Sequence, residues 1–135
     1  MSYALTTTVR SPFADTLAAT RASLADQGFG ILTEIDMQAT LKAKLNVDIP
    51  PQVILGACRP PLAYAALASE PSAGLLLPCN VVIRAADDET TVVEALDPQV
   101  IVSLTQNDAL SPVADEVGQR LSAALASVTQ AFADQ

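Results

Sequence analysis

The chain contains no histidine, and this absence excludes several common kinds of active site. A Ser-His-Asp triad or a Cys-His pair needs an imidazole as its general base, and many metal sites need imidazole ligands. A single copy of this chain therefore forms neither, so most familiar hydrolytic mechanisms are excluded.

Basic residues are also scarce. The 135 residues include 7 Lys and Arg against 15 Asp and Glu, which gives a net charge of -8 and an isoelectric point near 4.1. Nucleic acids and anionic membrane surfaces select clusters of Lys and Arg. We therefore expect neither nucleic acid nor a membrane surface as a partner.

The chain also has no tryptophan, only two cysteines and no long apolar run. No apolar run approaches the roughly 20 residues that a membrane-spanning helix needs, and the first ten residues lack the pattern of a signal peptide. Two cysteines make no disulfide framework, which is typical of a reducing compartment. The sequence thus indicates one cytoplasmic domain, spanning residues 1–135, whose core consists of Ala, Val, Leu and Ile.

The longest nearly uncharged run is GLLLPCNVVI, residues 74–83. Its β-branched second half favours a strand that is covered on both faces, and we expect a central strand here. Alternation places Cys79 on one face and Asn80 on the other. Pro78 cannot donate a ladder hydrogen bond, and a buried Asn80 amide would need partners, so this segment breaks the usual rules for a strand. Such breaks are often found at functional or strained sites.

Periodicity and capping residues place the other elements along the chain. No domain boundary is visible. Strands are expected at residues 3–10, 29–36, 53–58 and 90–96, and helices at residues 11–27, 37–45, 60–68, 98–104 and 111–132.

Three ordered motifs resemble the domain of unknown function 302 (DUF302) family: GFGILTEID at residues 28–36, ILGACRPPLAYAAL at 54–67, and GLLLPCNVVI at 74–83. The resemblance is strongest over residues 20–105. It implies an α+β domain with an about five-stranded, mostly antiparallel sheet, helices packed against it, and the order β-α-β-α-β-α-β-β-α-α. It also implies a homodimer and brings no established reaction. The family motif typically has His where this chain has Tyr64, and often Asn where it has Arg59.

The two cysteines are the first candidate site. Cys58 precedes the start of a helix and adjoins Arg59, and both features favour a thiolate. Cys79 lies in the apolar run beside a proline. If their strands are neighbours, the two sulfurs are close enough for a dithiol switch or a thiolate metal site; otherwise both cysteines simply fill the core.

Glu34 and Asp36 form a second candidate, because alternation puts both carboxylates on one face of a strand. They suit a hard cation or acid-base chemistry. Alternatively, Asp36 caps the following helix and Glu34 forms an ion pair with Arg59, Arg84 or a lysine. Glu34 is the stronger candidate, because its apolar neighbours suggest partial burial and hence a shifted pKa.

Two functions remain open. The first is a homodimeric module that binds an unknown small molecule, without turnover, in a pocket near the two cysteines. The alternative is a thiol enzyme or redox sensor, in which Cys58 or Cys79 is the nucleophile and Glu34 accepts the proton. We expect no cofactor and no metal site, because two thiolates are an incomplete ligand set. The ligand-binding candidates are Glu34, Arg59, Tyr64 and Asn80, and the catalytic candidates are Cys58, Cys79 and Glu34.

Overall fold

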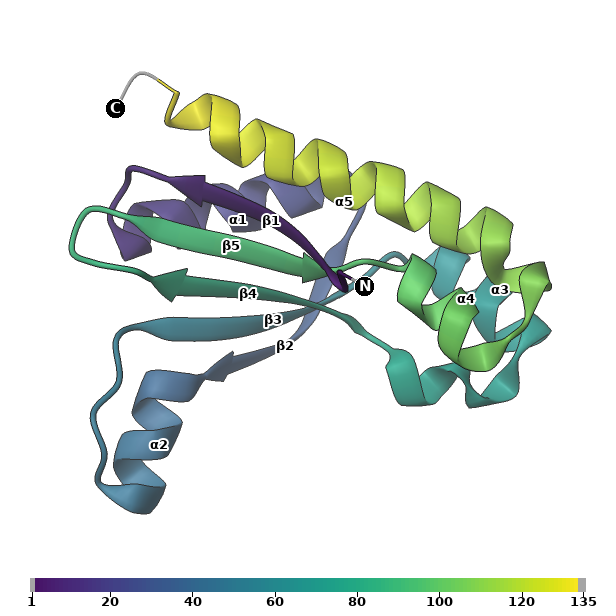
Figure 1. Ribbon diagram of the computed structural model, residues 1–135, viewed down its shortest axis with the longest axis horizontal. Coiled ribbons are helices and arrows are strands. Elements are labelled where there is room, and N and C mark those ends of the chain that lie inside the picture. The colour runs from purple at the N-terminus through teal and green to yellow at the C-terminus, as the bar shows by residue number, and fades with distance from the viewer. Residues whose placement is uncertain (1, 134–135) are drawn as a thin grey trace.

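The computed structural model describes residues 2–133, so the ends of the predicted domain, residue 1 and residues 134–135, lie outside it. The described chain follows the predicted order of strands and helices, with two 3-10 helices added (Figure 1). The strands are β1 (Ala4–Val9), β2 (Gly30–Asp36), β3 (Gln52–Cys58), β4 (Cys79–Ala85) and β5 (Thr91–Leu96). The helices are α1 (Phe13–Asp26), α2 (Met37–Leu45), α3 (Pro60–Ser69), η1 (Pro71–Leu76), α4 (Gln99–Thr105), η2 (Asp108–Leu110) and α5 (Ser111–Ala131).

The strands form one five-stranded sheet in the order β1-β5-β4-β3-β2, and every neighbouring pair is antiparallel. In Figure 1 this order runs from β1 at the top to β2 at the bottom. The expected α+β domain with an antiparallel sheet is therefore confirmed. Strands β3 and β4 are neighbours at the centre of the sheet, which brings the segments of the two cysteines together.

One face of the sheet is buried beneath α1 and α5. Alternate strand residues such as Leu55, Ile83 and Val93 are fully buried there, because successive side chains of a strand point to opposite faces. The apolar stripe of α5, which includes Leu121 and Val128, packs onto them. Most of the hydrophobic core lies between the sheet and these two helices.

The other face of the sheet, which we call the open face, has partly exposed side chains. Ile54, Val82 and Val92 lie on it. Arg84 forms an ion pair of 2.9 Å with Glu94 on the same face, so its main charges are paired within the chain.

A smaller apolar cluster lies beyond the end of the sheet, where α3, α4 and η2 meet the start of α5 (Figure 1). Ala66, Ile101 and Leu110 are buried in it, and Leu76 and Val113 pack against them. The molecule thus has two apolar clusters, and the ends of β3 and β4 point toward the region between them.

The segment 74–83 is not one central strand. Residues Pro71–Leu76 form the 3-10 helix η1, and β4 begins at Cys79. Pro78 has no N–H group for the ladder, so pairing begins only after it. Leu75 is 87% exposed, so the apolar run leaves the core at its N-terminal end.

Candidate functional site

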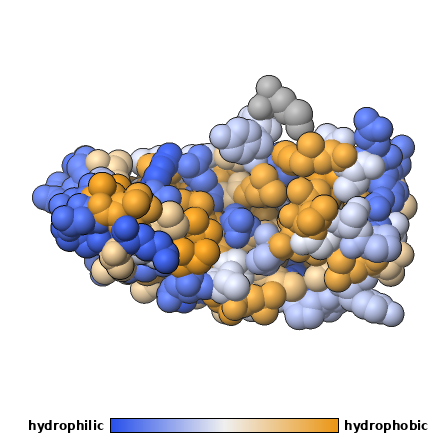
Figure 2. Space-filling view, turned by 90° about the horizontal axis from the view of Figure 1, so that it is seen from below, coloured by the Kyte–Doolittle hydropathy of each residue, from blue (hydrophilic) through white to orange (hydrophobic). Residues whose placement is uncertain are grey.

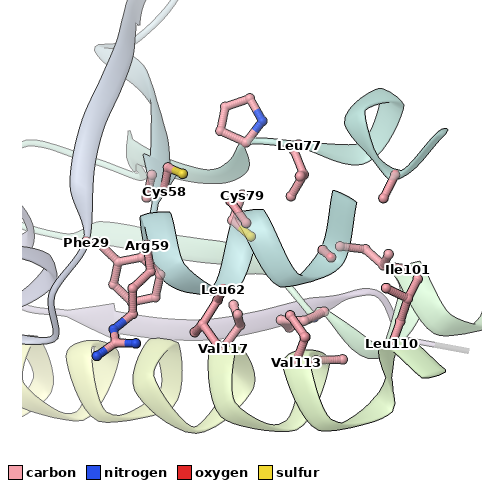
Figure 3. Close-up of a pocket in the computed structure, with 17 residues that line it drawn as sticks. Phe29, Cys58, Arg59, Leu62, Leu77, Cys79, Ile101, Leu110, Val113 and Val117 are labelled. Atoms are coloured by element: carbon pink, nitrogen blue, oxygen red, sulfur yellow. The ribbon is translucent and has the colours of Figure 1, made fainter. Parts of the chain in front are cut away.

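An apolar cavity of about 40 Å³ lies between the two apolar clusters (Figure 3). The ends of β3 and β4 form one side of it, and α3, η1, α4 and α5 surround the rest. Its lining consists mainly of aliphatic side chains and small alanines. The lining residues are Phe29, Ala57, Cys58, Arg59, Leu62, Ala63, Ala66, Ala73, Leu77, Pro78, Cys79, Pro98, Ile101, Leu110, Val113, Ala114 and Val117.

The cavity follows from the composition of the chain. Only 4% of the residues are aromatic, and five alanines contribute to the lining, so few bulky side chains are available to fill the space between the clusters. A water needs polar partners, and apolar cavities stay dry. The cavity therefore suits an apolar group better than water.

Cys79 supplies one of the two thiols in this lining. It is the first residue of β4, lies on the buried face, and is 6% exposed. Burial, and to a lesser extent the nearby Cys58, raises the pKa of the Cys79 thiol to about 11. Cys79 is therefore a neutral thiol at neutral pH, and a weak nucleophile.

Cys58 does not face Cys79 across the sheet. Its strand partner is Gly30 of β2, whereas Cys79 lies opposite Ala57. Because adjacent residues of a strand point to opposite faces, the two cysteine side chains leave the sheet in opposite directions. Both thiols are free, and both border the cavity because it lies at the ends of their strands. The strands are neighbours, as hypothesised, but the register does not bring the two sulfurs face to face.

Arg59 follows Cys58 and forms part of the cavity wall. Its side chain runs from the end of β3 toward α5 (Figure 3). Its Nε donates a hydrogen bond to the carbonyl of Gln27 at 3.3 Å, and its Nη1 lies 3.7 Å from Oε2 of Glu116. It passes over Gly28, whose φ of 84° is in the left-handed region, and a Cβ there would lie 2.9 Å from the Arg59 Nε. Arg59 is thus held at the boundary between the cavity and solvent.

Three of the predicted site residues lie elsewhere. Glu34 is exposed on the edge strand β2 and forms an ion pair with Arg21 of α1, so the expected partial burial is wrong. Tyr64 is 77% exposed on α3 and is not part of the lining. Asn80 is exposed on the open face, opposite to the buried side of Cys79.

Glu34 and Asp36, the predicted carboxylate pair, each have a partner within the fold. The Oδ1 atom of Asp36 accepts a hydrogen bond of 2.9 Å from the backbone N–H of Ala39, so Asp36 caps α2. Glu34 has its arginine partner on α1 rather than Arg59, Arg84 or a lysine. Both side chains thus have structural roles.

The sequence did not identify most of the lining. Leu62, Ile101, Leu110 and Val117 come from four different segments, and nothing in a linear pattern indicates that they surround one space. A partial signal was the alternation in β4, which already separated Cys79 from Asn80.

Among residues 2–133, no group of three or more Cys, Asp or Glu side chains is arranged to hold a metal ion. Within the same residues, no helix combines the length and apolar character required to cross a bilayer.

Comparison with known proteins identifies the family. The family model described as "Domain of unknown function DUF302" matches residues 5–128. The chain is similar to an uncharacterised conserved DUF302 protein from Bacillus stearothermophilus, whose crystal structure superimposes with a TM-score of 0.86. The two are 28% identical, and the match covers 94% of this chain and 98% of that one. No curated protein matches. With a family model that spans most of its length and a solved member of the same fold, this chain belongs to the DUF302 family.

Proposed function

We propose that this protein is a binding module that holds a small apolar group in the cavity beside Cys79, without chemical turnover. The observation that carries the proposal is the cavity itself, which is lined almost entirely by aliphatic side chains and lies at a junction between two apolar clusters. Small-molecule sites are typically concave and mostly apolar, with few polar groups.

The size of the cavity limits its occupant. A volume of 40 Å³ corresponds to about three water-sized spheres, which suits a chain of a few carbon atoms. The lining surrounds such a chain with side chains from both clusters, so a bound ligand would tie α3 and α4 to the sheet. We therefore expect the ligand to stabilise the folded protein by mass action.

The chemistry of Cys79 favours binding over thiol catalysis. A nucleophilic cysteine needs a thiolate, and burial raises the pKa of this thiol to about 11. Its neighbour in the ladder is Ala57 rather than the second cysteine. Glu34, the proton acceptor of the alternative hypothesis, is paired with Arg21 on the edge strand.

The second part of the proposal is that the module is a homodimer that uses its open face. Ile54, Val82 and Val92 are partly exposed there, and Ile35 at the edge is 44% exposed. The Arg84–Glu94 pair leaves this face nearly neutral, although the chain carries a net charge of -8. A second copy therefore meets less repulsion on this face than the overall charge would suggest.

Binding of 1-butanol tests the cavity proposal, with the methyl signals of the protein followed by NMR. We expect the alcohol to shift the methyl signals of Leu62 and Val117, which line the cavity. In Ala66→Val, two extra methyl groups enter the cavity and the shifts should disappear. Ala68→Val makes the same change at an exposed position of α3 and should bind as the wild type does. Undiminished binding in Ala66→Val would contradict the proposal.

A further inference from the structure

A cluster of three charged side chains includes Arg59, which lines the cavity, and Glu116 and Arg120 of α5, which lie outside the lining. Arg59 Nη1 is 3.7 Å from Glu116 Oε2, and Arg120 Nη2 is 3.8 Å from Glu116 Oε1. Two guanidinium groups therefore share one carboxylate. Arg59 itself lines the cavity, and Val117, which follows Glu116 in α5, lines it too.

Neither arginine is well satisfied by this carboxylate. Charge-assisted hydrogen bonds between guanidinium and carboxylate groups are typically about 2.7–2.9 Å long, and both contacts here are almost 1 Å longer. The Nε atom of Arg120 is buried and has no hydrogen-bond partner among residues 2–133. The cluster thus retains at least one N–H donor for a further acceptor.

The net charge of the cluster also favours binding of an anion. Two arginines and one glutamate leave one positive charge uncompensated, in a chain whose net charge is -8. Arg59 and Arg120 are each partly exposed, at 22% and 33%, so an anion from solvent can reach them. A guanidinium group presents paired donors that match the planar carboxylate.

We propose that the ligand of the cavity is a short-chain monocarboxylate, with its alkyl chain in the cavity and its carboxylate against the guanidinium groups of Arg59 and Arg120. This inference rests on the proposed function, because it assumes that the apolar chain occupies the cavity. A monoanion balances the single uncompensated charge, whereas a phosphate dianion would leave the cluster negative. The apolar lining offers no second cation for a dicarboxylate.

A comparison of butyrate with butyramide tests this inference. The two molecules have nearly the same shape, and only butyrate carries a charge. We expect butyrate to bind about tenfold more tightly, because a hydrogen bond to a charged group contributes roughly 1.5 kcal/mol or more. Dissociation constants come from NMR titrations of the wild type and of Arg120→Met, with Arg59→Met as a second variant.

Arg120→Met keeps the length of the side chain and removes its charge, so butyrate binding should fall to the level of butyramide while butyramide binding stays unchanged. Arg10→Met makes the same charge change at an exposed residue that follows β1, away from the cavity, and serves as the control. Equal affinities of wild-type protein for butyrate and butyramide would overturn the carboxylate inference and leave the cavity proposal standing. Failure of both molecules to bind would overturn the cavity proposal as well. Loss of butyrate binding in Arg10→Met to the same extent as in Arg120→Met would also overturn the inference.

Discussion

Cys79 lies opposite Ala57, and not opposite Cys58, in the ladder between β3 and β4. This register separates the two thiols onto opposite faces of the sheet, although their strands are neighbours. It leaves Cys79 among aliphatic side chains at the cavity and Cys58 half-buried at the end of β3. The chemistry of the two cysteines should therefore differ.

The first prediction concerns alkylation. At pH 8 iodoacetamide should modify Cys58 well before Cys79, because the buried Cys79 thiol has a pKa of about 11 and is almost entirely protonated. Mass spectrometry of the native protein, taken at successive times, gives both rates. Faster labelling of Cys79 than of Cys58 would contradict the raised pKa of the buried thiol.

The second prediction concerns stability at high pH. The unfolded thiol ionises near its ordinary pKa of 9.0, whereas the folded Cys79 stays neutral until about pH 11. The unfolded state therefore gains stability as the pH rises through this interval, and the free energy of unfolding should fall by up to about 2–3 kcal/mol. Below pH 8 this contribution should be constant.

Urea denaturation of wild type and Cys79→Ala, compared between pH 8 and pH 11, isolates this effect from other groups that titrate in the same range. The difference in unfolding free energy between the two proteins should change with pH in the direction that favours the variant at high pH. A difference that is independent of pH would contradict the raised pKa.

The third prediction concerns Gly56 in the centre of β3. A Cβ at this position would collide with Thr33 Oγ1 and lie 2.8 Å from Pro78 Cγ, so Gly56→Ala should destabilise the fold by about 2–3 kcal/mol. At Gly30 the nearest atom would be 3.9 Å away, so Gly30→Ala is the matched control on the neighbouring strand. Thermal unfolding of both variants should show a large loss for the first and a small one for the second.

The fourth prediction concerns the open face. Val82→Asp puts a charge in the middle of the proposed contact between two copies and should convert the dimer to a monomer in sedimentation velocity. Ala18→Asp makes the same charge change on an exposed position of α1 and should leave the dimer intact. A wild-type protein that sediments as a monomer would refute the dimer proposal outright.

Local signals predicted much of the fold. The helix α2 spans residues 37–45, as expected, because Asp36 is an effective cap and the adjoining strand has a clear alternation. The strand alternation also put Cys79 and Asn80 on opposite faces, as the structure does. The helix cap and the strand alternation depend on residues that are close in the sequence, so a sequence pattern predicts both.

Features that depend on strand order and packing were not predictable in the same way. Glu34 was expected to be partly buried, but β2 lies at the edge of the sheet, and its sequence does not reveal that position. The apolar residues 74–77 resemble a strand, yet the chain up to Leu76 forms η1, which contacts α3 and α4. The exposed leucines of this region, Leu67, Leu75 and Leu104, lie on the helical end of the molecule.

The exposed apolar residues gather in particular areas of the surface. Figure 2, seen from below, has apolar residues gathered in two areas with polar residues between them. One area lies on the side of α2, and the other on the side of the helical end. The exposed apolar residues of these two regions are Leu32, Ile35, Leu45 and Val47, and Tyr64, Leu67, Leu75 and Leu104.

Methyl NMR spectra under xenon pressure test most directly whether the cavity accepts a small apolar group, since xenon enters dry apolar cavities. We expect xenon to shift the signals of Leu62, Val113 and Val117, and Ala66→Val to abolish these shifts. The signals of Val82 and Val92 on the open face should stay unchanged. Shifts confined to the open face, or no shifts at all, would contradict the cavity proposal.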